Sequence, residues 1–128
     1  MENIYKKWQP LKDIPRVLYC EGIHDDYEGF RILLRENDRS PILRIMFDAV
    51  RSYRKSDEGD LLRTIASISD PGRSSLFTVE NSSWVKWFHE ETYDIHKDRD
   101  IKHFAIYTPD DCVDALSEFE PKVEWLNP

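Results

Sequence analysis

The sequence contains few glycines and none of the glycine-rich strings that hold phosphate groups. Its four glycines form neither G-x-x-x-x-G-K nor G-x-G-x-x-G, which disfavours nucleotide binding. The run His89-Glu-Glu-Thr-Tyr93 resembles the start of a zinc-protease helix, but Tyr93 occupies the place of the second histidine ligand. We therefore expect no metal and no cofactor.

Cysteines and long apolar runs are scarce as well. The two cysteines, Cys20 and Cys112, lie far apart in apolar contexts, which favours reduced, buried thiols over a disulfide. No stretch approaches the ~18 apolar residues of a membrane span, and the first seven residues lack the apolar run of a signal peptide. These absences predict a cytoplasmic protein without membrane contact.

The composition is that of a folded domain. Hydrophobic residues make up 40% of the 128 positions and aromatic residues 12%, and aromatic side chains supply large buried areas. The length suits one core, and no repeat or low-complexity linker divides the chain. We predict one α+β domain over residues 1–128, mainly an antiparallel sheet of about five or six strands with two or three helices.

Alternating apolar residues predict the strands of this sheet. Segments 16–22 and 29–35 flank a polar turn, as hairpin strands do. Period-two alternation continues through a long third strand, and the apolar residues of 101–107 suggest a strand covered on both faces. The predicted strands span residues 16–22, 29–35, 42–53, 76–80, 101–107 and 123–126.

Apolar residues three or four positions apart predict the helices. A short helix is expected over 61–68, ended by Ser-Asp-Pro-Gly at 69–72. Capping residues at 81–83 precede a second apolar stripe from Trp84 to Ile95. Pro109-Asp-Asp111 could open a third helix that runs through Leu116.

Two histidines lie in settings that could support acid–base chemistry. His24-Asp25-Asp26, with Glu28 nearby, places an imidazole beside three carboxyl groups, although such residues are also typical of a hydrated hairpin turn. His103 stands alone in a predicted strand, where a histidine is more often a satisfied core or rim residue than a catalyst. We assign no catalytic residue, and a small enzyme with a His/Asp site stays an alternative.

Acidic charge is concentrated at the C-terminus. The chain has 25 acidic and 18 basic residues, a net charge of −7, and residues 103–128 hold six acids against one base. Such a field attracts cationic ligands and repels a phosphate backbone, so we expect a basic protein partner and no nucleic acid. The predicted partner-binding residues are Asp110, Asp111, Asp114, Glu118, Glu120, Glu124 and Trp125.

Two runs of the sequence resemble small bacterial proteins of one class. They are Phe77-Thr-Val-Glu-Asn-Ser-Ser-Trp-Val-Lys-Trp-Phe88 and His103-Phe-Ala-Ile-Tyr-Thr-Pro-Asp-Asp-Cys-Val-Asp-Ala-Leu116. With the small size and the acidity, they resemble the immunity proteins that bacteria pair with secreted or contact-delivered toxins. The resemblance implies stoichiometric binding of a toxin domain, often a basic nuclease. That class shares no common binding motif, so the resemblance assigns no residue.

The sequence thus favours a protein-binding module over an enzyme. Acids would speed the association with a basic toxin domain, while Trp125 and neighbouring aromatic residues would slow dissociation. A homo-oligomeric structural or regulatory protein is a further alternative, in which an open sheet edge and exposed tryptophans pair two copies. The oligomeric state stays open.

Overall fold

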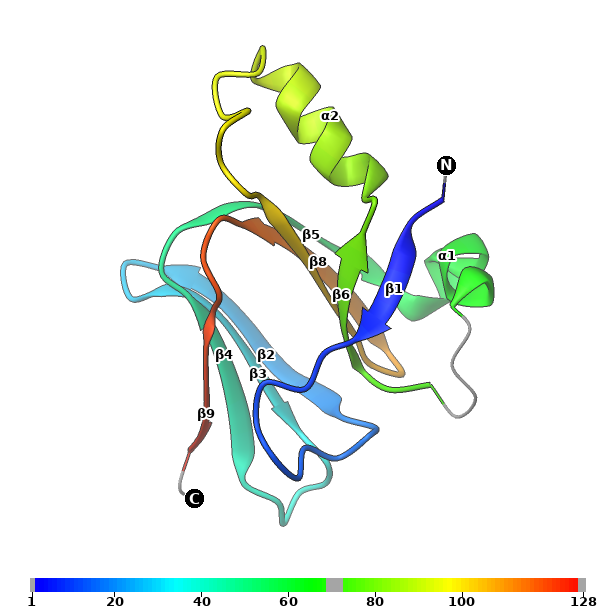
Figure 1. Ribbon diagram of the computed structural model, residues 1–128. Coiled ribbons are helices and arrows are strands. Elements are labelled where there is room, and N and C mark those ends of the chain that lie inside the picture. Colours follow the sequence, from blue (N-terminus) through cyan, green and yellow to red (C-terminus); the bar gives the residue numbers. More distant parts are fainter. Residues whose placement is uncertain (1, 69–72, 127–128) are drawn as a thin grey trace.

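Nine strands in two antiparallel sheets make up most of the computed structural model, which describes residues 2–68 and 73–126 (Figure 1). One sheet has the order β1-β6-β7-β8-β5 and the other the order β2-β3-β4-β9. The strands are β1 (Ile4–Lys7), β2 (Tyr19–Asp26), β3 (Gly29–Arg35), β4 (Ile42–Phe47), β5 (Val50–Asp57), β6 (Leu76–Glu80), β7 (Lys102–Tyr107), β8 (Asp111–Ser117) and β9 (Lys122–Leu126). The helices are α1 (Leu62–Ser67) and α2 (Ser83–Glu91), with a 3₁₀ turn η1 (Glu58–Asp60) before α1.

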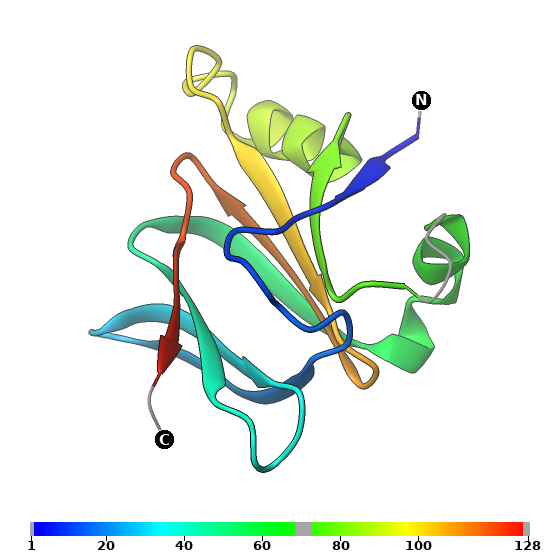
Figure 2. The ribbon, with the colours of Figure 1, turned by 60° about the horizontal axis from the view of Figure 1, so that its bottom comes forward.

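The main core lies between the two sheets. Because side chains alternate along a strand, every second residue of β3 and β4 is buried, from Phe30 to Phe47. These residues pack against Phe104, Ile106 and Val113 of the five-stranded sheet. Figure 2 shows the connection between β1 and β2 running across the two sheets, where its residues Trp8, Leu11 and Ile14 pack against the core.

The second face of the five-stranded sheet is covered by the helices. Phe77 and Tyr107 pack with Leu61 and Ile65, in and next to α1. Trp84 and Phe88 of α2 pack on Ile101 and Leu116. The sheet is therefore buried on both sides, which confirms the prediction of a strand at 101–107 that is covered on both faces.

Several predicted elements need correction. The long strand over 42–53 is two strands, because the chain turns at Asp48-Ala49 and passes from the four-stranded sheet to the five-stranded one. β1 was not predicted, and the number of strands exceeds the five or six expected. The predicted helix end at 69–72 lies outside the described residues. The fold is nevertheless a single α+β domain built mainly on antiparallel strands.

The predicted helix over 109–116 is wrong, since these residues belong to β8. The Thr108 N–H donates to the Asp111 carbonyl at 2.8 Å, so the chain reverses directly after β7. Both faces of β8 are buried and carry apolar residues, and over so short a run this pattern resembles the apolar spacing of a helix. The second predicted helix ends at Glu91 rather than near Ile95, because Tyr93 and Asp94 adopt φ values of 52° and 57°.

Candidate functional site

Four of the six C-terminal acids bind basic side chains of the same domain. Asp111 lies 3.1 Å from Lys55, Asp114 lies 3.3 Å from Arg54, and Glu118 lies 3.0 Å from Arg99. Glu124 binds Arg44, the residue directly opposite it on β4. The bases come largely from β4 and β5, the strands that pair with β9 and β8.

The predicted acidic surface is therefore divided. Asp114 is 1% exposed, so the prediction that it contacts a partner is wrong. Asp110 and Glu120 are exposed, but they flank opposite ends of β8. Of the predicted set, Glu118 and Glu120 stay together, in the turn between β8 and β9.

Trp125, the predicted aromatic anchor, is half-buried on β9. It packs against the main core opposite Leu43. Its ring also lines a pocket of about 350 Å³ with Pro15, Pro41 and Glu36. Trp125 is therefore partly structural, and it lies near the C-terminal end of β9, whereas the Glu118–Glu120 turn precedes the start of that strand.

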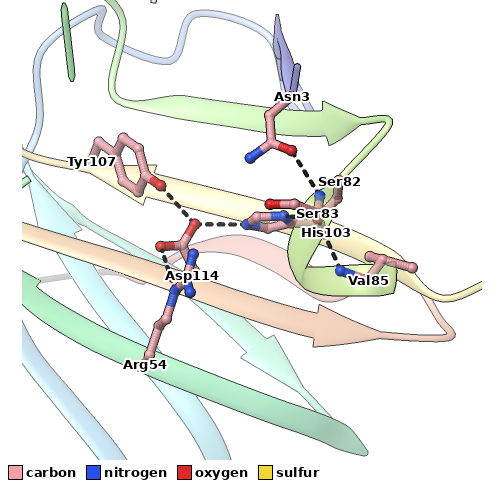
Figure 3. Close-up of polar contacts among 8 residues, drawn as sticks. All are labelled: Asn3, Arg54, Ser82, Ser83, Val85, His103, Tyr107 and Asp114. Carbon is pink, nitrogen blue, oxygen red and sulfur yellow. Dashed lines mark hydrogen bonds and ion pairs between the residues drawn. The ribbon is translucent and has the colours of Figure 1, made fainter. Parts of the chain in front are cut away.

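A line of buried polar side chains crosses the helix-covered face of the five-stranded sheet (Figure 3). The Ser82 Oγ lies 2.7 Å from His103 Nδ1, and His103 Nε2 lies 2.7 Å from Asp114 Oδ1. The Tyr107 hydroxyl donates to the same Asp114 oxygen at 2.7 Å. All four side chains are 5% exposed or less. With Asp114 ionised and His103 neutral, Nε2 donates the ring proton to Asp114, and Nδ1 accepts the Ser82 hydroxyl proton.

Local structure explains where each member of this line stands. Side chains point alternately to the two faces of the sheet along β7 and β8, so His103, Tyr107 and Asp114 all lie on the face that the helices cover. Ser82 lies between β6 and α2, and its Oγ accepts the Val85 N–H at 3.1 Å as the helix N-cap. Asn81, directly before it, has φ of 53°, which turns the chain sharply from strand to helix.

Asp114 is held on both of its oxygens. Arg54 Nε donates to Oδ2, and the Arg54 guanidinium lies 4.4 Å from the centre of the Trp84 ring. Trp84 in turn contacts the His103 imidazole edge-on, with ring centres 5.4 Å apart. Burial, with the Asp114 charge as the second cause, raises the pKa of Tyr107 far above its usual range. Tyr107 therefore stays a hydrogen-bond donor to Asp114 at any ordinary pH.

A pocket of about 560 Å³ borders the Ser82 end of this line. It lies where β6 leaves and β7 enters the sheet, beside the start of α2. Val79, Val85 and Ile101 supply apolar walls, and Ser82 and His103 also line it. The rim carries charges of both signs, from Glu80, Lys86, Asp100 and Lys102.

The other predicted histidine cluster is a surface hairpin. Asp26 and Glu28 both bind Arg31, at 2.8 and 2.9 Å, and Asp25 accepts the Tyr53 hydroxyl at 2.9 Å. His24 is exposed on β2. The sequence did not predict Ser82 and Asp114 as partners of His103, or Tyr107 and Arg54 as partners of Asp114. Treating 111–117 as a strand would have found Asp114, since β7 and β8 would then share a face.

Large apolar side chains are exposed where α2 ends. Tyr93 is 91% exposed, Ile95 is 73% exposed, and Phe119 in the β8–β9 turn is 65% exposed. The end of the α2–β7 connection contacts the β8–β9 turn, because Arg99 binds the Glu118 side chain at 3.0 Å and Lys102 binds the Glu118 carbonyl at 2.9 Å. We call Tyr93, Asp94, Ile95, Phe119 and Glu120 the Tyr93 surface.

Comparison of the chain with protein-family models, curated proteins and solved structures finds no match. Among the described residues, no helix has the length and apolar character needed to cross a membrane. No three His, Cys, Asp or Glu side chains of the described segments are grouped so that they could hold a metal ion.

Proposed function

We propose that the protein is a binding module that neutralises a basic protein partner, most specifically an immunity protein that inhibits a bacterial toxin domain by stoichiometric binding. The exposure of Tyr93 and Ile95 in the loop after α2, with Phe119 exposed in the β8–β9 turn that the end of this loop contacts, carries this proposal. Single exposed apolar residues are ordinary, whereas a group rimmed by polar residues is typical of an interaction site. Aromatic anchors in such groups supply much of the binding energy.

The backbone that presents this surface supports the same function. Tyr93 and Asp94 both adopt left-handed φ values, which cost non-glycine residues roughly 1–2 kcal/mol each. The strained turn does not bury the Tyr93 and Ile95 side chains in the fold, because both stay largely exposed. Packing of Tyr93 and Ile95 against a partner would offset this strain.

Charge around the Tyr93 surface selects a cationic partner. In residues 90–98 and 118–121, all described, the exposed acids are Glu90, Glu91, Asp94, Asp98 and Glu120. Lys97 is the exposed base in the same segments. An excess of carboxylates around an apolar centre attracts a basic protein and repels nucleic acid. A toxin nuclease, whose lysines and arginines grip phosphates, has the complementary charge.

The test uses the protein as bait, with variants at two exposed tyrosines. Wild type, a Tyr93→Gly/Ile95→Ser double variant and Tyr27→Ser would be offered a cell extract and any basic toxin domain that a neighbouring gene encodes. Tyr27 is the control because it is 96% exposed on the β2–β3 hairpin, away from the Tyr93 surface.

We expect wild type and Tyr27→Ser to retain the toxin domain in equal amount and to block its activity. Rising salt should release it, and the double variant should bind at least about tenfold more weakly, the size expected for loss of an aromatic anchor. Equal retention by all three proteins would exclude the Tyr93 surface. Failure of wild type to retain any basic protein would exclude the function.

A further inference from the structure

We infer that Ser82, His103 and Asp114 form a nucleophilic site that transfers the acyl group of a small carboxylic ester to water. This activity is separate from the binding of a basic partner, and it uses a different face of the domain. It rests on three observations: the hydrogen-bonded line of three side chains, the place of Ser82 at a strand-to-helix turn, and the adjoining pocket.

The line contains the parts that nucleophilic catalysis by serine requires. A hydroxyl, an imidazole and a carboxylate are joined by two contacts of 2.7 Å, within the range for proton transfer. The ring nitrogens have fixed roles, since Nδ1 faces Ser82 and Nε2 faces Asp114. Asp114 is a positioning residue, because it holds the imidazole with Nδ1 free to accept a proton. Tyr107 and Arg54 fix Asp114 in turn.

The position of Ser82 favours attack by its oxygen. It follows β6 and precedes α2, and the left-handed Asn81 makes the turn between them sharp. The Val85 N–H already donates to Oγ and would stabilise negative charge there. The positive end of the α2 dipole and the adjacent Trp84 amide would stabilise charge on the carbonyl oxygen of a bound ester.

The pocket defines the substrate class. Its volume of about 560 Å³ fits a short acyl chain with a small alcohol, and Val79, Val85 and Ile101 provide apolar contact for both. The lysines at the rim are engaged, since Lys86 binds the Asn81 amide oxygen and Lys102 binds Glu118 and Asp100. A neutral ester therefore suits the pocket better than a charged one.

The reaction proceeds in two balanced steps. Ser82 Oγ bonds to the ester carbonyl carbon while its proton passes to His103 Nδ1, and that proton leaves with the alcohol when the C–O bond breaks. Water then attacks the acyl-serine, gives one proton to Nδ1 and releases the carboxylic acid. The proton on Nδ1 returns to Ser82 Oγ. No oxidant, reductant or metal is required.

An alkyl fluorophosphonate and p-nitrophenyl acetate are suitable probes. The intact protein should gain one phosphonyl group on Ser82, located by peptide mass spectrometry, and should hydrolyse the ester. Ser82→Ala and Ser82→Asp should lose labelling and at least about 100-fold in rate. Ser82→Asp keeps an N-cap oxygen for α2, so it separates loss of chemistry from loss of folding. Ser83→Ala, one residue away with an exposed side chain, should keep both activities.

Asp114→Asn provides a test of positioning. In samples with a native circular dichroism spectrum, we expect kcat to fall at least about tenfold with KM unchanged, because the imidazole is misoriented while the pocket is intact. Absence of a Ser82 adduct in wild type, or an adduct that persists in Ser82→Asp, would overturn the inference. Either result leaves the partner-binding proposal standing, since that proposal depends on the Tyr93 surface.

Discussion

Arg54 and Asp114 occupy directly opposed positions on β5 and β8, with Arg54 Nε 3.3 Å from Asp114 Oδ2. The pair illustrates how the domain treats its C-terminal acids. β5 carries Arg51, Arg54 and Lys55, and each of these bases lies close to an acid on or next to β8. Three of the six C-terminal acids, Asp111, Asp114 and Glu118, are therefore balanced by bases of β5.

Asp114→Asn should lower the free energy of unfolding by about 2–4 kcal/mol, because buried hydrogen bonds from His103 and Tyr107 lose their charged acceptor. The Arg54 side chain is 52% exposed, so water screens its ion pair and most of the loss belongs to the two buried bonds. Urea midpoints at an unchanged m-value measure the effect.

Asp110→Asn is the matched control for this variant. Asp110 is exposed in the turn between β7 and β8, directly before the strand that carries Asp114. Its replacement should change the free energy of unfolding by no more than about 0.5 kcal/mol. If Asp114→Asn and Asp110→Asn unfold at the same urea concentration, the buried network contributes nothing to stability.

β3 was predictable because one of its faces is buried and its apolar residues alternate. The strand at 101–107 was predictable from a continuous apolar run, and the α2 apolar stripe follows from Trp84 and Phe88. β8 was not predictable in this way. Val113 packs toward the other sheet and Leu116 toward α2. Both faces of β8 therefore carry apolar residues, and hydrophobicity does not alternate along the strand with a period of two.

Prediction of the candidate site required β8 to be predicted as a strand. His103 was recognised as a possible base, but its partner Asp114 lay in a predicted helix and Ser82 was seen only as a capping residue. Their meeting is set by the register of β7 with β8 and by the turn at Asn81. Neither is encoded by local spacing, because register depends on contacts between residues distant in sequence.

Alkaline solution should destabilise the domain through its buried thiol and phenol. Burial raises the pKa of Cys112 from 9.0 to about 12, and it raises the pKa of Tyr107 as well. An acid whose pKa rises on folding keeps its proton longer in the folded state. Its contribution is fully present below the unfolded pKa and is lost as the pH rises toward the folded pKa.

We therefore expect unfolding free energies from urea titrations to be level to about pH 8.5 and then to fall between pH 9 and 12. Each group contributes a slope of about 1.4 kcal/mol per pH unit within its own window. Cys112→Ala should reduce the slope above pH 9, while Tyr107 and Cys20, whose pKa values burial also raises, maintain the rest. A slope that Cys112→Ala leaves untouched would mean that the thiol titrates normally.

At position 93, glycine should stabilise the domain more than alanine does, which reverses the usual order of the two residues. Tyr93 has φ of 52°, a conformation that costs alanine roughly 1–2 kcal/mol and glycine nearly nothing. Tyr93→Gly should therefore unfold at a higher urea concentration than Tyr93→Ala. At Lys86, inside α2, the same pair of substitutions should show alanine ahead by about 1 kcal/mol. If the alanine variant is more stable than the glycine variant at both positions, the turn after α2 is not left-handed.

Charge reversal should separate the Tyr93 surface from the rest of the acidic exterior. Asp94→Lys/Glu120→Lys reverses two exposed carboxylates within that surface, whereas Glu36→Lys/Asp38→Lys makes the same change in net charge at the β3–β4 turn, on the opposite end of the domain (Figure 1). Steering depends on the field near the contact, so the first variant should associate with the basic partner about tenfold more slowly at low salt and the second nearly as fast as wild type.

The difference should shrink at high salt, because screening removes the long-range attraction but not the packing of Tyr93 and Ile95. Stopped-flow association with the purified toxin domain measures both rates. Equal slowing by the two variants would show that the net charge of −7 steers the partner, rather than the local surface.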